Sequence, residues 1–165
     1  MSTKVKVQIT AKDMFRFQLY HNYTRFSGIF GLLIGLGLMA LGVIDITTGN
    51  ASASFIWFVC SFVIMVFPIQ TMKNKSKLQV QRVEMFQHPV EYEFTEIGFT
   101  ARQGEVEVTN EWDAIEKVVG TKRYLYFYMS RVRAIIFPKE SMGDNYETIL
   151  SLVREHMPAE KVKVK

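Results

Sequence analysis

Cysteine is almost absent from this chain: Cys60 is the only one, so no disulfide bond can form within the chain. Histidine is also scarce. His21, His88 and His156 form neither an H-x-x-x-H nor an H-E-x-x-H pattern, the spacings typical of zinc ligands. The phosphate-binding pattern G-x-x-x-x-G-K and the nucleophile turn G-x-S-x-G are missing as well. We therefore expect no enzyme activity, no metal site and no cofactor.

Charge is missing from two long stretches. Residues 26–44 hold no ionisable side chain, and 19 helical residues at about 1.5 Å each nearly match a hydrocarbon core of ~30 Å. A second uncharged stretch covers residues 55–71. A buried helix of a soluble protein would normally carry a polar stripe, which neither stretch has. We therefore expect a transmembrane helical hairpin over residues 26–72, with spans at 26–46 and 53–72, anchored in the lipid bilayer.

Basic residues are missing from the short loop between these stretches but gather on either side of them. Positive charge close to a membrane tends to stay in the cytoplasm. We therefore expect a multi-pass protein of the cytoplasmic membrane with both termini in the cytoplasm. The flanking basic residues are Lys4, Lys6, Lys12, Arg16, Arg25, Lys73, Lys75, Lys77 and Arg82.

The remaining charge speaks against nucleic acid as a partner. The whole chain has a formal net charge of +4, but the basic residues that cause it flank the apolar stretches. Residues 89–165 contain 11 basic and 13 acidic side chains, whereas a nucleic-acid-binding domain would carry a basic face. We expect no binding of nucleic acid.

Glycine is frequent in the first apolar stretch. Gly31 and Gly35 form a G-x-x-x-G pattern, which lets a second helix backbone approach closely. The second stretch is the expected partner, because a short tether gives it a high effective concentration. A homodimer through the same glycines is the alternative.

The segments next to the apolar stretches predict one strand and two helices. Residues 4–10 alternate apolar and polar side chains, as a half-buried strand does. Thr10 and Asp13 are spaced as a helix cap, so residues 1–25 should form this strand and a juxtamembrane helix. We expect a second juxtamembrane helix over residues 73–88, ending before Pro89.

From residue 89 onward the pattern changes to short strands, which predicts an α+β domain over residues 89–158. We expect strands near 90–94, 97–102, 106–110 and 117–121, with Trp112 and Ile115 in a turn that enters the core. Residues 124–129 and 132–137 should form a hairpin linked by Ser130 and Arg131. A last amphipathic helix covers 145–156, and the charged tail 159–165 should be frayed.

Two groups of charged residues remain to be placed. Lys122, Arg123, Arg131 and Arg133 lie at the ends of two strand segments that should be adjacent, and we expect them to converge near one rim. Such a rim could bind anionic lipid headgroups or an acidic partner; the alternative is ordinary loop charge that keeps the hairpin soluble. The acidic residues that alternate along strands should face solvent: Glu91, Glu93, Glu105 and Glu107.

The chain resembles the YcxB-like family of bacterial membrane proteins. The resemblance rests on F-T-x-x-G at 94–98, W-x-x-I at 112–115, Y-x-F-type residues at 126–128 and I-x-P-K at 136–139, and it extends over nearly the whole chain. It implies a pleckstrin-homology-like domain, an antiparallel sheet or barrel closed by a C-terminal helix, and it implies no catalytic residues. Fold alone does not give function.

Together these features predict a non-enzymatic, membrane-anchored interaction or regulatory module with a protein partner. The alternative is a sensor of anionic lipid surfaces that uses the four basic residues.

Overall fold

The computed structural model describes residues 2–164 of the 165-residue chain. The chain forms two compact units. One contains the residues up to Asp13 together with those from Val80 onward, and the other contains Met14–Gln79. The second unit is therefore inserted into the first. The α1 helix, Ala11–Tyr23, begins in the first unit and continues into the second.

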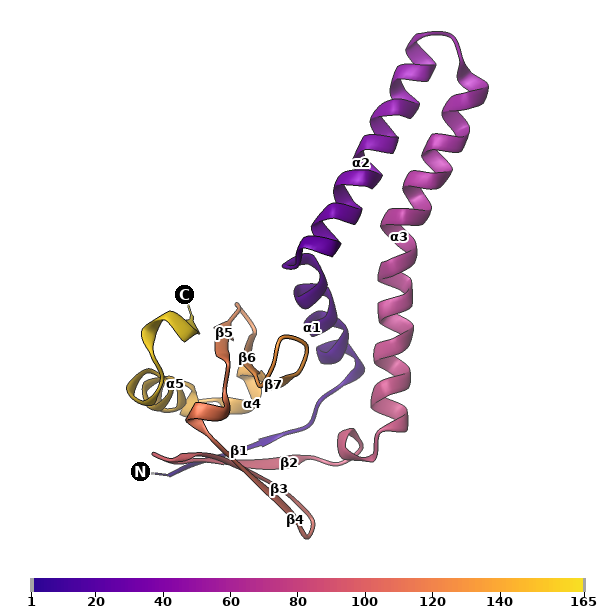
Figure 1. Ribbon diagram of the computed structural model, residues 1–165. Helices are drawn as coiled ribbons and strands as arrows, with labels where there is room; N and C mark the ends of the chain where they lie inside the picture. Colours follow the sequence, from indigo (N-terminus) through magenta and orange to yellow (C-terminus); the bar gives the residue numbers. More distant parts are fainter. Residues whose placement is uncertain (1, 165) are drawn as a thin grey trace. The chain divides into compact units, whose positions relative to one another are not determined.

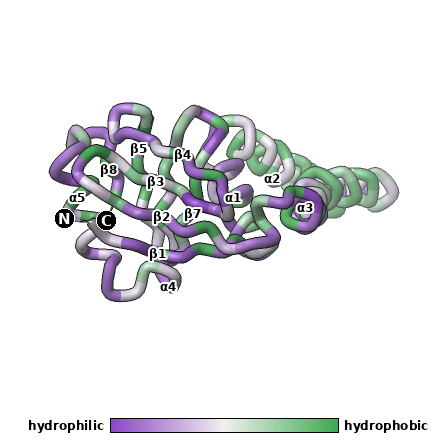
Figure 2. Tube along the Cα trace, turned by 90° about the horizontal axis from the view of Figure 1, so that it is seen from below, coloured by the Kyte–Doolittle hydropathy of each residue, from purple (hydrophilic) through white to green (hydrophobic). Residues whose placement is uncertain are grey.

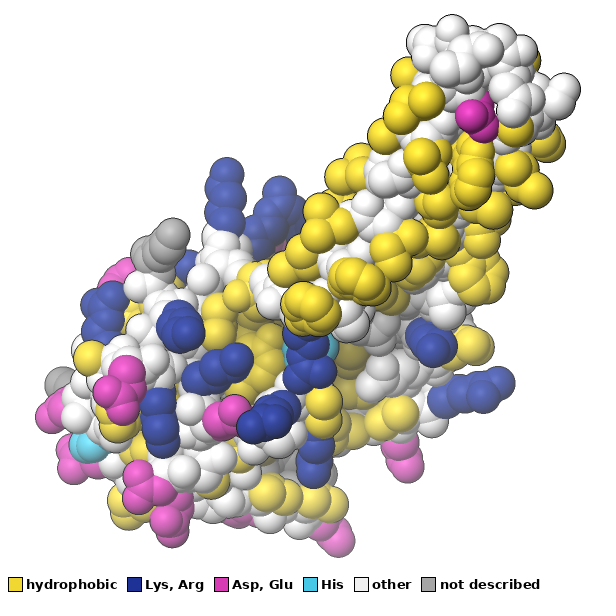
Figure 3. Space-filling model, turned by 45° about the horizontal axis from the view of Figure 1, so that its top comes forward, with side chains coloured by type: hydrophobic (Ala, Val, Ile, Leu, Met, Phe, Trp, Pro, Cys, Tyr) yellow, Lys and Arg dark blue, Asp and Glu magenta, His cyan; other side chains and the backbone are white. Residues whose placement is uncertain are grey.

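Two long helices dominate the inserted unit. The α2 helix spans Phe26–Thr47 and α3 spans Ala51–Arg82, and they run side by side in opposite directions (Figure 1). Both are long and apolar enough to cross a membrane, judged by length and composition. Figure 2 shows α2 mostly in the green of hydrophobic residues. On the face seen in Figure 3, hydrophobic side chains cover much of these helices.

Two glycines of α2 that are seven residues apart, Gly35 and Gly42, lie against side chains of α3. Gly28, the third buried glycine of α2, lies instead against the Asn22 backbone of α1. A Cβ at Gly35 would lie 2.6 Å from Met65 Cγ, and the Ser61 hydroxyl donates a hydrogen bond to the Gly35 carbonyl at 2.7 Å. The predicted close approach is thus confirmed at Gly35. It is wrong at Gly31, where an added Cβ meets nothing within 4 Å, because the contact repeats every seven residues and not every four.

The predicted helix over residues 73–88 is shorter than expected. The α3 helix ends at Arg82, Val83 is extended, and a single 3-10 turn, η1, follows at Glu84–Phe86. The Gln87 side chain donates a hydrogen bond to the Gln81 carbonyl at 2.9 Å. This contact supplies a donor to a carbonyl of the last helical turn, which has no helical partner once the helix stops.

The first sheet has the strand order β1-β2-β3-β4, and all of its pairs are antiparallel. Its strands are β1 (Thr3–Val7), β2 (Val90–Phe94), β3 (Gly98–Gln103) and β4 (Val106–Glu111). Each matches a strand predicted from the sequence. Val7 lies opposite Val90, so the inserted unit leaves the sheet between two neighbouring strands. The predicted domain boundaries, residues 89–158, therefore leave out β1, which belongs to the same sheet as β2.

The second sheet has the order β7-β6-β5-β8. It contains β5 (Lys117–Gly120), β6 (Tyr124–Tyr128), β7 (Ala134–Pro138) and β8 (Val162–Lys163). The predicted β6–β7 hairpin is confirmed, but its two-residue link is wrong: residues 129–133 connect the strands. The amides of Met129 and Ser130 both donate to the Arg133 carbonyl, which closes a wider turn that needs no glycine.

The predicted fraying of the tail is also wrong for residues 159–164, whereas Lys165 lies outside the described residues. After the 3-10 turn η3 at Ala159–Lys161, β8 pairs parallel to β5, with Val162 opposite Val118. A Cβ on Gly120 would lie 2.7 Å from Val164 Cγ1, so the glycine makes room for the tail. Val162 and Val164 are partly buried against the core, and this packing holds the tail in place despite its charged lysines.

The core lies between the two sheets. Phe94 and Phe99 of the first sheet meet Phe127 and Phe137 of the second, with Phe99 and Phe127 edge to face at 5.8 Å. The predicted turn is confirmed as η2 at Trp112–Ala114, and it buries Trp112. The short helix α4 (Lys139–Met142) and the predicted helix α5 (Asn145–His156) complete this unit.

The α+β class is confirmed, but the strands of residues 2–164 form two separate sheets and no closed barrel. The break falls at η2, which separates β4 from β5. At the edge of the first sheet opposite β4, β1 contacts α4 and α5 and pairs with no strand of the second sheet.

Candidate functional site

The structure does not bring the four predicted basic residues together. Lys122 and Arg123 precede β6, whereas Arg131 and Arg133 follow it. The five residues of β6 rise about 3.4 Å each, which puts the two pairs roughly 17 Å apart at opposite ends of the strand. The expectation of one basic rim is therefore wrong, because both pairs flank the same strand and not the same end of two strands.

The β6–β7 loop retains one feature of a binding surface. Arg131 and Arg133 are exposed, and Val132 between them is 62% exposed. The amides of Val132 and Arg133 donate to the Ser130 hydroxyl, which orders the loop. An apolar side chain between two cations suits contact with an anionic, partly apolar surface.

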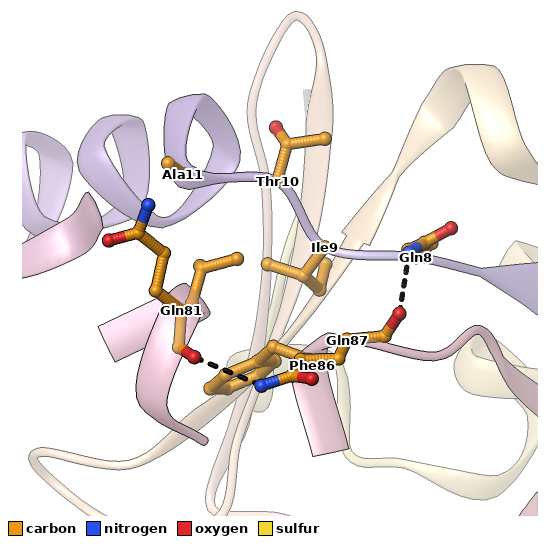
Figure 4. A pocket seen from close by; sticks show the side chains of 8 residues that line it. Gln8, Ile9, Thr10, Ala11, Gln81, Phe86 and Gln87 are labelled. Atoms are coloured by element: carbon orange, nitrogen blue, oxygen red, sulfur yellow. Dashed lines mark hydrogen bonds between the residues drawn. The ribbon is translucent and has the colours of Figure 1, made fainter. Parts of the chain in front are cut away.

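A cluster of glutamines holds the connector between α3 and β2. The Gln8 side chain donates to the Gln87 carbonyl at 3.1 Å, and the Gln103 amide donates to the carbonyls of Met85 and His88, each at 2.9 Å. Figure 4 shows the bond from Gln8 to Gln87. Gln8 follows β1 and Gln103 ends β3, so residues of both strands beside β2 hold the segment that enters β2.

Beside this cluster lies an open groove of about 770 Å³. Figure 4 shows Ile9 and Phe86 near one another in it, with the amides of Gln81 and Gln87 alongside. The lining mixes apolar carbons with amide and hydroxyl groups and contains no ionisable side chain. Its residues are Gln8, Ile9, Thr10, Ala11, Val80, Gln81, Phe86 and Gln87.

Asp13 anchors the start of α1 to the second sheet. The Thr10 amide donates to Asp13 Oδ2 at 2.9 Å, which is the predicted helix cap in reciprocal form. The other carboxylate oxygen, Oδ1, accepts a hydrogen bond from the Tyr124 hydroxyl at 2.7 Å. One side chain therefore ties the strand-to-helix connection to β6.

Ion pairs run across the outer face of the first sheet. Arg102 Nη1 lies 2.6 Å from Glu93 Oε2, Arg102 Nη2 lies 3.1 Å from Glu107 Oε1, and Lys4 Nζ lies 3.7 Å from Glu93. The Arg102 hydrogen bond and the Lys4 charge lower the pKa of the Glu93 carboxyl. On the opposite face, burial raises the pKa of Tyr92 to about 12.

The acidic side chains meet the expectation of a solvent-facing role only in part. Glu105 and Glu107 are exposed, whereas Glu91 and Glu93 are half-buried. Glu93 is in addition paired with Arg102. Among residues 2–164 no group of three His, Cys, Asp or Glu side chains could hold a metal ion.

Sequence reasoning missed the glutamines and the role of Tyr124. Gln8, Gln87 and Gln103 lie far apart in the chain and in no recognisable motif, so only the pairing of β1, β2 and β3 brings them together. The one available signal was the position of Gln103 directly after a predicted strand.

Comparison with protein families gives a match for part of the chain. Residues 94–153 match the family model described as YcxB-like protein. The predicted resemblance to the YcxB-like family is confirmed. The matched region begins in β2 and ends in α5, so it contains most of the aromatic core of the two-sheet unit but not β1, Gln8 or the long helices. No curated protein and no solved structure matches the chain.

Proposed function

We propose that this protein is a non-enzymatic interaction or regulatory module anchored at the inner face of the cytoplasmic membrane. The observation that carries the proposal is the insertion of the long helical hairpin between β1 and β2, two strands that pair directly. The YcxB-like domain is thus joined to the hairpin by two connections at one end of one sheet.

Exposed apolar surface supports the membrane anchor. A core helix of a soluble protein would be mostly buried, whereas α2 and α3 expose large side chains such as Phe26, Leu33, Phe55 and Phe67. The pairing of β1 with β2 supports an even number of crossings, because both strands must lie on one side of the membrane. The flanking basic residues favour the cytoplasmic side.

The proposed domain is of the pleckstrin-homology-like kind. Two packed antiparallel sheets followed by one C-terminal helix agree with that architecture, and the family match over residues 94–153 supports it. The two-residue β8, which pairs parallel to β5, comes from the C-terminal tail.

The surface features that a partner protein could bind lie on the YcxB-like domain. The β4 strand and the β6–β7 loop expose apolar side chains beside charged ones, and the groove beside Gln87 is lined by neutral groups. General acid-base catalysis requires titratable groups in a shared pocket, which this groove does not supply. These features favour a protein partner over a substrate.

Sensing of anionic lipid is the second candidate function. The loop with Arg131, Val132 and Arg133 favours it, because juxtamembrane basic residues gain about 1 kcal/mol each near an anionic leaflet. The separation of Lys122 and Arg123 from this loop weakens it, since the four charges do not act at one site. Assembly as a homodimer remains the alternative to a different protein partner.

Two experiments in native membranes test the proposal. In a Cys60→Ser background, a membrane-impermeant maleimide should label Gly49→Cys from outside the cell but not Ser2→Cys. Labelling of Ser2→Cys in intact cells would contradict the topology. A photoreactive residue at Arg131 should then give a specific protein adduct, whereas adducts with phospholipid alone would favour the lipid sensor.

A further inference from the structure

The first sheet has two edge strands, and only one of them is covered. At β1 the Asn145 side chain donates a hydrogen bond to the Lys4 carbonyl at 3.2 Å, and α4 and α5 pack against the strand. A helix over an edge prevents another strand from pairing there. At β4 five of the six residues are exposed, and the strand order of the described chain ends with it.

The backbone of β4 presents outward hydrogen-bonding groups. The Trp112 amide donates to the Ile97 carbonyl at 3.2 Å, which sets the alternation of the β3–β4 ladder. Val106, Val108 and Asn110 therefore bond toward β3. The N–H and C=O groups of Glu107 and Thr109 point away from the sheet, where an added strand could pair with them.

The two faces of β4 differ in chemistry. Val108 lies opposite Ala101, which lies opposite Tyr92, so Val106 and Val108 continue the core-facing side of the sheet. They are nonetheless 65% and 50% exposed. The other face carries Glu107 and Glu111. A strand that complements β4 needs aliphatic residues on one face and basic residues on the other.

The same sheet contains a pair that meets this requirement. In β1, Lys-Val-Lys-Val at residues 4–7 lies against Val-Glu-Tyr-Glu at residues 90–93 of β2. Lys4 Nζ lies 3.8 Å from Glu91 and 3.7 Å from Glu93, while Val5 faces Tyr92. Val-Glu-Val at residues 106–108 repeats the pattern that β2 offers to β1.

We propose that β4 binds an extended segment of a partner protein, in which lysine or arginine alternates with aliphatic residues, as an added strand of the first sheet. This inference rests on the proposed interaction function and names the surface and the chemistry of the partner. The β4 strand of a second copy is a poor occupant, because side-by-side pairing of two such strands would bring glutamates together.

The test uses the full-length protein in lipid nanodiscs and a fluorescent peptide, TKVKVQIT, whose sequence copies residues 3–10. We expect saturable binding, measured by fluorescence anisotropy. Thr109→Pro removes an outward N–H but no ladder bond to β3, so it should weaken binding about tenfold or more. Thr109→Val is the matched control, because it also removes the threonine hydroxyl but keeps the N–H, and it should bind like the wild type.

A charge swap provides a second variant should Thr109→Pro fold poorly. Glu111→Lys should weaken binding of TKVKVQIT and strengthen binding of the charge-reversed peptide TEVEVQIT. Equal binding to wild type, Thr109→Pro and Glu111→Lys would overturn the inference. The inference would also be overturned if the protein formed concentration-dependent dimers and Thr109→Pro abolished them, because β4 would then bind a second copy of the chain.

Crosslinking from two sites separates this inference from the proposed function. Capture of a protein from Arg131 together with failure of the peptide at β4 would reject only the added strand. Failure to capture any protein from either Arg131 or Thr109 would reject the interaction function itself. Capture of a protein whose crosslinked segment alternates basic and aliphatic residues at Thr109 would support both.

Discussion

The hydroxyl of Tyr124 donates a hydrogen bond to Oδ1 of Asp13 at 2.7 Å, which joins two residues 111 positions apart. Tyr124 begins β6, and Asp13 lies in the first turn of α1. The same carboxylate accepts the Thr10 amide. The contact therefore connects the second sheet to the segment through which the chain leaves the two-sheet unit for the long helices.

Removal of this contact should destabilise the domain by a measurable amount. Tyr124→Phe leaves a buried ring in place and deletes one hydrogen bond to a charged acceptor, so we expect a loss of about 1.5–3 kcal/mol. Asp13→Asn combined with Tyr124→Phe should cost less than the sum of the two single changes. Additive costs in a thermal or chemical unfolding cycle would show that the pair does not couple.

Two glycines of the same helix should respond differently to alanine. Gly35→Ala places a Cβ 2.6 Å from Met65 Cγ and disturbs the hydrogen bond from Ser61, so we expect a loss of about 1–3 kcal/mol. Gly31→Ala meets open space and should change stability by less than about 0.5 kcal/mol. Thermal unfolding in detergent measures both, and an equal loss for the two variants would contradict the seven-residue contact pattern.

The connector before β2 should loosen when its glutamine contact is removed. Gln103→Ala deletes donors to the Met85 and His88 carbonyls, and we expect a loss of about 1–2 kcal/mol. Hydrogen exchange of residues 83–89 should rise selectively. Gln8→Ala, which removes a single exposed contact to Gln87, should have a smaller effect. Unchanged exchange in Gln103→Ala would mean that the connector is held by other contacts.

Acid should destabilise the domain partly through Glu93. Its pKa in the folded state is lowered from 4.5, chiefly by the hydrogen bond from Arg102. The unfolded state therefore takes up the proton first as pH falls. The stabilisation is present above the unfolded value and disappears as pH drops through the folded pKa. Melting temperatures of Glu93→Gln should fall less steeply than those of the wild type between about pH 5 and about pH 3.

Arg102→Met provides the check on that pH dependence. It removes the main cause of the lowered pKa of Glu93, so its melting temperature should also fall less steeply in acid. An acid profile identical to the wild type in both variants would show that other carboxylates account for the whole loss.

Local patterns predicted the elements well because each depends on residues close in sequence. Alternation along residues 4–7 and 90–94 indicated two strands, and the apolar face of 145–156 indicated the last helix. The errors fell where a distant segment completes a local structure. The tail became β8 only because β5 offers it a partner, and the helix after the second apolar stretch stopped where Gln87 reaches back to Gln81.

The candidate site was harder to predict than the elements. Lys122, Arg123, Arg131 and Arg133 were correctly placed at the ends of strand segments, but β6 separates the two pairs. Strand ends can be predicted from the sequence. Which end of the sheet each of them lies at depends on the direction of every neighbouring strand.

The sequence by itself determined two long apolar helices, seven of the eight strands of residues 2–164, the C-terminal helix and the YcxB-like resemblance, because charge and side-chain periodicity are local properties. Only the tertiary structure decided that β1 joins β2 and that the long helices are inserted between them. It also decided that β1 is covered while β4 stays open. Strand pairing across such a distance in sequence depends on which combination of faces buries the aromatic core, and no local pattern specifies that combination.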